Sequence, residues 1–230
     1  MSTLIPEYEL RVSEILVYFE FLESLLEKDA QLHFPRGRKL KYARCGEDLL
    51  KILKANTFLI LYNLIESSIR NGVAKIYDAV RSDGMSYVDI CQQLKVIWVH
   101  KQFAPDEGRK IENNAKRLME LIDSVLTAEL VSLDARDLPI AGNVDADQIR
   151  ILADKYGFQF AASAKLKGGN LLKRVKDERN SLAHGYKSFG ECGRDLTYEG
   201  LVDIRKQVIP YLRQVLRGID RFISRRSYAA

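Results

Sequence analysis

The chain has 230 residues, of which 47% are hydrophobic and 29% are charged, and its formal net charge is +5. The hydrophobic share fits a globular protein and excludes a disordered one, and the length fits one large domain or one domain with an insertion. The charge favours an acidic partner, of which nucleic acid is the commonest. Because we recognise no secretory signal and no membrane span of about 20 apolar residues, we expect no membrane partner.

Three cysteines lie far apart and form no CxxC pair, which argues against a disulfide framework and favours a reducing compartment. The histidines, His33, His100 and His184, are not spaced as metal ligands usually are. His33 is expected at the start of a loop and His100 at a helix end. We therefore expect no metal site, no cofactor and a cytoplasmic location.

Helical periodicity dominates the N-terminal third of the chain. Apolar residues from Ile15 to Leu25 recur on one face of a helix predicted over roughly 7–28. A basic connector follows at 35–44, and a second helix is predicted from about 47 to 80. Its middle, 58–65, is apolar nearly all round, which places it at the centre of a bundle.

The stretch from about 81 to 166 is predicted to be a helical insertion. The residues at 86–89 resemble a capping box before a helix. Apolar spacing over 111–126 predicts another amphipathic helix. Asp145 can begin a short helix that Gly157 closes.

The C-terminal third predicts two further helices. One runs from about 170 to 183 and ends near Gly185, and the last is capped by Thr197 and contains Pro210, which should kink it. No strand pattern of useful length is found. The predicted fold class is all-α, an up-and-down helical bundle with additional inserted helices, in a single domain over 1–230.

Positive charge is concentrated near the C-terminus. Residues 165–187 hold seven Lys or Arg and two acids, and residues 205–226 hold seven and one. This asymmetry is the footprint expected of a phosphate-backbone site, although either cluster alone could be a solvated helix face. Lys173, Arg174 and Lys176 are candidate RNA-binding residues.

His184 stands out because of its neighbours. Asn180, four residues earlier, shares its helix face and could hold the imidazole in one tautomer. Arg179 points about 140° away, at 100° per residue, so one helix does not bring both groups onto one phosphate. Two copies across a two-fold axis could do so, which predicts a homodimer with 179–184 near the axis. Taken alone, the pair could equally be a surface cation and a helix-end histidine.

The segment 176–185 resembles the R-N-x-x-x-H signature of the HEPN superfamily. These helical domains occur in many bacterial toxins, phage-defence proteins and RNA-processing factors. The resemblance continues through 187–195, 149–158 and 62–66, and so covers most of the chain.

The resemblance implies a HEPN-like helical bundle that dimerises, with both signatures facing a shared cleft, and metal-independent cleavage of RNA. Histidine side chains titrate near neutral pH, so His184 can take a 2′-hydroxyl proton while Arg179 stabilises the phosphate charge. The product would carry a 2′,3′-cyclic phosphate. The predicted function is a metal-independent endoribonuclease of toxin or phage-defence type, with Arg179, His184, Asn180 and Glu66 as its candidate catalytic residues.

Two of the candidate residues have more than one interpretation. Glu66 is a carboxylate on the apolar central helix, where it could orient His184, pair with Arg179, or only pin the bundle. Tyr186 follows His184 by two, and in related HEPN toxins a tyrosine so placed is modified by a partner nucleotidyltransferase. It is therefore a candidate site of regulatory modification.

The alternative function is a non-catalytic HEPN-like module that binds nucleotide, RNA or a protein partner. Intact Arg179, Asn180 and His184 favour the enzyme over such a module. A plain helical scaffold would leave the charge asymmetry unexplained. The expected partners are RNA, a second copy of the chain, and a cognate antitoxin or nucleotidyltransferase.

Overall fold

The computed structural model describes residues 4–28, 30–36, 39–102, 112–134, 142–163, 166 and 169–230. Within these ranges the chain forms eight helices and one two-stranded hairpin. In chain order they are α1 (Leu4–Leu26), β1 (Gln31–Arg36), β2 (Lys39–Arg44), α2 (Glu47–Ser82), α3 (Gln92–Gln102), α4 (Glu112–Leu126), α5 (Ala146–Tyr156), α6 (Asn170–Ala183), α7 (Phe189–Arg194) and α8 (Tyr198–Ser224).

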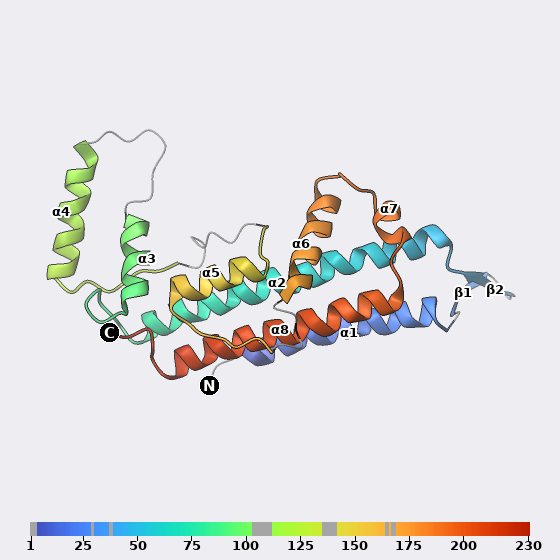
Figure 1. Ribbon diagram of the computed structural model, residues 1–230, viewed down its shortest axis with the longest axis horizontal. Coiled ribbons are helices and arrows are strands. Elements are labelled where there is room, and N and C mark those ends of the chain that lie inside the picture. The colour runs from blue at the N-terminus through green and yellow to red at the C-terminus, as the bar shows by residue number, and fades with distance from the viewer. Residues whose placement is uncertain are drawn as a thin grey trace.

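The long helices α1, α2 and α8 lie side by side and form the body of the bundle (Figure 1). Helix α2 contacts α1, α6, α7 and α8, and its residues Phe58, Leu61 and Ile65 are fully buried. The all-α fold class is therefore confirmed, and the apolar run at 58–65 lies at the centre as predicted. Burial on several sides explains why this run lacks a polar face.

Several helix ends are formed by the predicted capping residues. The Asp145 carboxylate accepts hydrogen bonds from the backbone N–H groups of residues 147 and 148, and Gly157 closes α5 with φ 81°. The Thr197 hydroxyl accepts from the N–H of Gly200 at the start of α8. Pro210 lies inside α8, which nevertheless runs unbroken from Tyr198 to Ser224.

The expectation that the chain lacks strands is wrong. Strands β1 and β2 pair antiparallel, with Gln31 opposite Arg44, so most of the basic connector is a hairpin and His33 lies in a strand. The alternation Lys39-Leu40-Lys41-Tyr42 has the period of a β-strand, a pattern that the high charge of this stretch obscured. In Figure 1 the hairpin extends beyond one end of the bundle.

The predicted capping box at 86–89 forms a turn instead of a helix start. The Asp89 carboxylate accepts from both the N–H and the hydroxyl of Ser86, at 2.9 and 2.6 Å. Ile90 then pairs with Ala229, and α3 begins only at Gln92. The pairing with the C-terminal segment holds Ile90 out of helical geometry.

The predicted insertion contains α3, α4 and α5. Helices α3 and α4 stand away from the body, whereas α5 lies on it (Figure 1). Helix α4 matches the helix predicted over 111–126, although residue 111 lies outside the described residues. None of the described helices combines the length and apolar character needed to cross a bilayer.

Candidate active site around the end of helix α6

Helix α6 carries the signature, and its two ends are set by glycines. It starts after Gly169 and packs through the buried residues Leu172, Val175 and Leu182. It ends at Ala183 and is capped by His184, whose N–H donates to the carbonyl of Asn180 at 3.0 Å, and Gly185 follows with φ 71°. Positive φ at this place is the usual way in which a helix stops. Arg179 and Asn180 therefore belong to the last turn, whereas His184 lies just beyond it.

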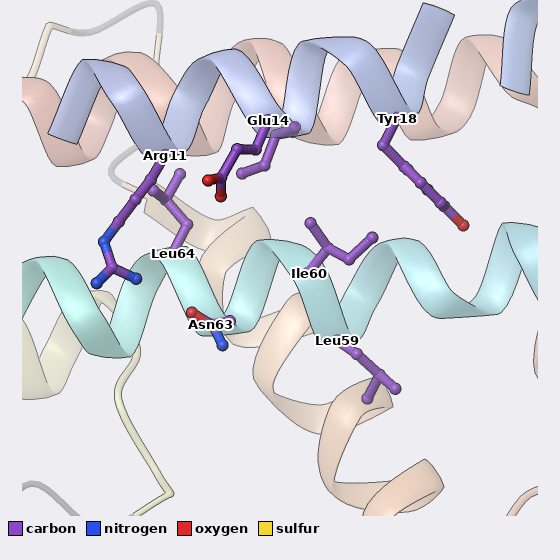
Figure 2. Close-up of a pocket in the computed structure, with 8 residues that line it drawn as sticks. Arg11, Glu14, Tyr18, Leu59, Ile60, Asn63 and Leu64 are labelled. Atoms are coloured by element: carbon purple, nitrogen blue, oxygen red, sulfur yellow. The ribbon is translucent and has the colours of Figure 1, made fainter. Parts of the chain in front are cut away.

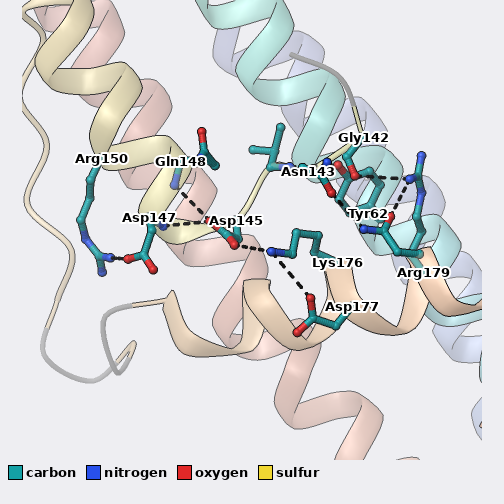
Figure 3. Close-up of polar contacts among 12 residues, drawn as sticks. Tyr62, Gly142, Asn143, Asp145, Asp147, Gln148, Arg150, Lys176, Asp177 and Arg179 are labelled. Carbon is teal, nitrogen blue, oxygen red and sulfur yellow. Dashed lines mark hydrogen bonds and ion pairs between the residues drawn. The ribbon is translucent and has the colours of Figure 1, made fainter. Parts of the chain in front are cut away.

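Arg179 is held against the central helix. Its guanidinium lies over the ring of Tyr62, 4.3 Å from the centroid. Its Nη1 donates to Oδ1 of Asn180 at 2.8 Å and to the carbonyl of Gly142 at 3.4 Å (Figure 3). Such a stack and two hydrogen bonds fix the planar guanidinium in one orientation.

The loop at 142–145 completes this arrangement. Oδ1 of Asn143 accepts from Nδ2 of Asn180 at 3.0 Å, and the N–H of Val144 donates to the Tyr62 hydroxyl at 3.0 Å. This loop thus forms hydrogen bonds to both α2 and α6 beside Arg179. The hydrogen bonds of the Asn180 side chain go to Arg179 and Asn143 in this structure, and none described here goes to His184.

The end of the same loop is fixed by an ion pair. Nζ of Lys176 lies 2.6 Å from Oδ2 of Asp145, and their side chains are only 17% and 10% exposed. Burial alone would raise the pKa of Asp145, but the hydrogen bonds from Lys176 and from the backbone of α5 hold that pKa below its usual value. The basic run on α6 is therefore divided. Lys173 and Arg174 are exposed and suited to phosphate contacts, whereas Lys176 is occupied with Asp145.

Glu66 lies one turn after Tyr62 on α2, and its side chain is 26% exposed. Its carboxylate is 3.5 Å from Nη2 of Arg70. Burial raises the pKa of the Tyr62 hydroxyl, and the nearby Glu66 charge raises it further. The ion pair of Glu66 with Arg70 lies within α2, so it is none of the three roles considered for Glu66.

Glu66 and Arg179 line one pocket, the Arg179 pocket, of about 450 Å³. Tyr62, Arg70 and, from α1, Arg11 also line it. Three arginines and one glutamate make this pocket positive, as a phosphate site requires.

Arg11 and Arg70 were not singled out from the sequence. Arg70 carries a detectable signal, since it follows Glu66 by four on a predicted helix. Arg11 carries none, because it reaches the pocket only through the packing of α1 on α2.

His184 has a different environment. It is exposed, and its ring centroid is 5.8 Å from that of Tyr186, which is 81% exposed. The N–H groups of Tyr186 and Lys187 both donate to the carbonyl of Ser181, at 2.9 and 3.2 Å. The turn after α6 is thus fixed in its backbone while its rings face outward.

The segment after the turn is anchored on α2 and α6. Lys187 pairs with Glu178 at 3.0 Å, and Ser188 and Glu191 form a capping box that begins α7. This box is present in the sequence but was not recognised there. A Cβ at position 193 would lie 1.9 Å from the carbonyl oxygen of Lys51, so only glycine allows α7 to approach α2 so closely. Among the described residues, no cluster of three or more acidic, cysteine or histidine side chains could hold a metal ion.

A helical bundle that carries Arg-Asn-x-x-x-His at the end of one helix is a HEPN-type domain. The family model HEPN_MAE_28990-like HEPN matches residues 1–228, and the chain therefore belongs to this family. Neither the curated proteins nor the solved structures contain a match to the chain.

Proposed function

We propose that the protein is a metal-independent endoribonuclease of toxin or phage-defence type, whose active site is composed at the interface of a homodimer. The observation that carries this proposal is the pairing of a fixed Arg179, inside a positive pocket, with an exposed His184 at the end of the same helix. Membership of a HEPN family supports it, since these domains are frequently ribonucleases.

The proposed chemistry uses the RNA's own 2′-hydroxyl. His184 accepts the hydroxyl proton, and the 2′-oxygen attacks the adjacent phosphorus. The bond between phosphorus and the 5′-oxygen breaks, the 5′-oxygen takes up a proton from solvent, and a 2′,3′-cyclic phosphate remains. Arg179 binds the non-bridging oxygens and stabilises the negative charge that develops on them. Because Tyr62, Asn180 and Gly142 already hold Arg179, little reorganisation is needed when the substrate arrives.

The divergence of the two side chains supports a site composed from two chains. Arg179 lies against α2, whereas His184 projects beyond the end of α6 beside Tyr186. We therefore propose that each site takes Arg179 from one protomer and His184 from its partner, across a two-fold axis.

The exposed face of α1 supports the proposed dimer. Leu10, Val17 and Phe21 follow one side of this helix and are 66%, 65% and 45% exposed. Beside them lies a groove of about 570 Å³ between α1 and α2, in which Arg11 and Glu14 reach toward Asn63 of α2 (Figure 2). This groove shares Arg11, Leu59 and Asn63 with the Arg179 pocket, so an apolar surface and the candidate site are continuous.

Light scattering tests the assembly. We expect a dimer at micromolar concentration, and we expect Val17→Asp to shift it toward monomer, because it places a charge in the apolar interface. The matched control is Leu126→Asp on α4, which introduces the same charge at a residue that is 77% exposed and far from α1 in the sequence. A wild-type monomer, both free and with RNA, would contradict the proposal.

Incubation of the purified protein with RNA in the presence of EDTA tests the activity. We expect cleavage that EDTA does not change and products with 2′,3′-cyclic phosphate ends. DNA, and RNA with a 2′-methoxy group at the cut position, should remain intact because they lack the attacking hydroxyl. Full activity of His184→Ala would instead favour the non-catalytic module that binds nucleotide, RNA or a protein partner.

We further propose that a partner nucleotidyltransferase or antitoxin controls the enzyme at Tyr186. Its hydroxyl is on the surface, and its ring is next to that of His184, so a modifying group would add bulk and charge beside the acid/base residue. Tyr186→Phe should keep RNA cleavage and escape inhibition when the partner is present. Inhibition of this variant equal to that of the wild type would remove Tyr186 from the proposal.

A further inference from the structure

The C-terminal end of α8 carries a second hollow that the candidate active site does not use. The segment after α5, residues 158–163, runs along α8. A Cβ at Gly218 would lie 2.5 Å from the carbonyl oxygen of Gln159, so the glycine allows close approach. The N–H of Ser163 donates to Oε1 of Gln214 at 2.9 Å and fixes the other end. Two adjoining cavities flank this segment, and we name them together the α5–α8 groove.

The first cavity is cationic. It measures about 440 Å³, and Arg221 and Arg225, one helical turn apart on α8, line it. No Asp or Glu is among its lining residues in the described part of the chain. Neither arginine forms an ion pair with another described residue, whereas the neighbouring Arg226 is paired with Asp83 at 2.9 Å. Two like charges without a carboxylate favour a bound anion.

The second cavity is aromatic. It measures about 430 Å³ and is lined by Phe158, Phe160 and Tyr211, with Arg150 and Asp154 at its wall. The rings of Phe160 and Tyr211 meet edge to face, with centroids 5.8 Å apart. Tyr211 is fully buried, and its hydroxyl has no hydrogen-bond partner among the described residues.

The two cavities are neighbours, because Gln159 and Phe160 line both of them. A surface that places aromatic rings beside two arginines without a carboxylate partner matches a nucleotide, with its flat base and its charged phosphate. An acidic peptide without aromatic side chains would use the arginines but would leave the aromatic cavity empty.

We propose that the α5–α8 groove binds a single-stranded segment of RNA, with a base against Phe160 and adjacent phosphates on Arg221 and Arg225. The groove shares no lining residue with the Arg179 pocket. It is therefore a second contact for the RNA that the proposed function takes as substrate, and to that extent it rests on the proposed function. It also uses Arg221 and Arg225, two of the seven cations of the basic cluster at 205–226.

The test measures binding alone, with the His184→Ala protein and a fluorescein-labelled single-stranded RNA of about 12 nucleotides. Fluorescence anisotropy should show Arg221→Gln/Arg225→Gln binding about tenfold more weakly near 0.1 M salt. The slope of log affinity against log salt should fall by about 1.4, since each phosphate contact with a single strand contributes about 0.7. Phe160→Leu should weaken binding by about fivefold or more through loss of stacking, with the slope unchanged.

The matched control is Arg194→Gln/Lys206→Gln, which removes the same charge from exposed positions outside the groove. It should bind RNA nearly as the His184→Ala parent does. Thermal unfolding of each variant confirms that the fold is intact.

Equal binding by the groove variants and the control, failure of the parent to bind RNA, or equal competition by polyglutamate would each overturn the proposal. The proposed function is judged separately, by RNA cleavage with the wild type. If the groove binds RNA but the wild-type protein does not cleave RNA, this inference is supported and the proposed ribonuclease activity is wrong.

Discussion

Arg179 and His184 lie five residues apart, and their surroundings differ in nearly every respect. Arg179 is half-buried, stacked on Tyr62 and bonded to Asn180 and Gly142, with the loop at 142–145 closing around it. His184 is exposed beyond the helix end and contacts the ring of Tyr186. In the proposed dimer, Arg179 is positioned in advance by its own chain, and His184 is accessible to the second chain.

The largest effect is expected from removing either member of this pair. His184→Ala and Arg179→Ala should each lower the rate of RNA cleavage by about 10²- to 10⁴-fold, because one removes the acid/base group and the other the charge-stabilising contact. Single-turnover cleavage of a labelled RNA measures both. A loss of less than about fivefold in either variant would contradict its assigned role.

The stabilities of the same two variants should differ. His184→Ala should change the free energy of unfolding by less than about 0.5 kcal/mol, since the side chain is exposed. Arg179→Ala should cost about 1–2 kcal/mol, because it removes a cation–π contact and two hydrogen bonds. The contacts responsible for the cost of Arg179→Ala come from segments that are distant in the sequence. Denaturant unfolding followed by circular dichroism separates the two cases.

Asp145→Asn tests the anchor of the loop. Asparagine still caps α5 but loses the charge that pairs with Lys176, so the free energy of unfolding should fall by about 2 kcal/mol. The control is Asp147→Asn, which breaks an exposed pair with Arg150 on the same turn and should cost less than about 0.5 kcal/mol. Equal costs would show that burial of the Lys176 pair is unimportant.

The same pair predicts a pH dependence. The pKa of Asp145 is lowered in the folded protein, so its contribution to stability is present above the ordinary pKa of about 3.9. It is lost as the pH falls through the lowered value. The difference in stability between wild type and Asp145→Asn should therefore be constant near neutral pH and shrink in acid. A difference that grows on acidification would contradict this.

A smaller effect is expected at Asn143, which positions Arg179 only through Asn180. Asn143→Ala should lower kcat by about fivefold, as loss of one hydrogen bond loosens the guanidinium, with KM nearly unchanged. Asn143→Asp keeps the acceptor for Asn180 and should restore most of kcat. If kcat falls equally in Asn143→Ala and Asn143→Asp, the loop supports the fold without positioning Arg179.

The smallest effect is expected on the exposed face of α6. Lys173→Ala should weaken RNA binding a few-fold and lower its salt slope by about 0.7, with the cut position unchanged. Lys176→Ala should instead lower stability, because Lys176 is engaged with Asp145. Weaker RNA binding by Lys176→Ala, with its stability unchanged, would mean that Lys176 leaves Asp145 to contact RNA.

Local chemistry made much of the fold predictable. The apolar run in α2 and the caps at Asp145 and Thr197 involve residues close together in sequence, so their structure follows from spacing and side-chain type. The hairpin was not predicted because the many charged residues of this stretch obscured its alternation of polar and apolar side chains. Helix α7 was missed although Ser188 and Glu191 mark its start.

The site was predictable only in part. The signature identified Arg179, Asn180 and His184. The partner of Arg179, Tyr62, lies 117 residues before it in the sequence, and the partner of Asn180, Asn143, lies 37 residues before it. Neither hydrophobic periodicity nor composition predicts which loop will pack against a given helix. Only the tertiary structure shows that the Asn180 side chain accepts a hydrogen bond from Arg179.

The central claim, that one site takes Arg179 and His184 from different chains, is tested most directly by mixing two inactive variants. His184→Ala and Arg179→Ala proteins should be mixed under conditions that allow protomers to exchange, and RNA cleavage measured. In a mixed dimer one of the two sites regains both residues, so activity should recover to about a quarter of the wild-type value with random pairing. No recovery, with exchange demonstrated by tagged chains, would contradict a site composed of two protomers.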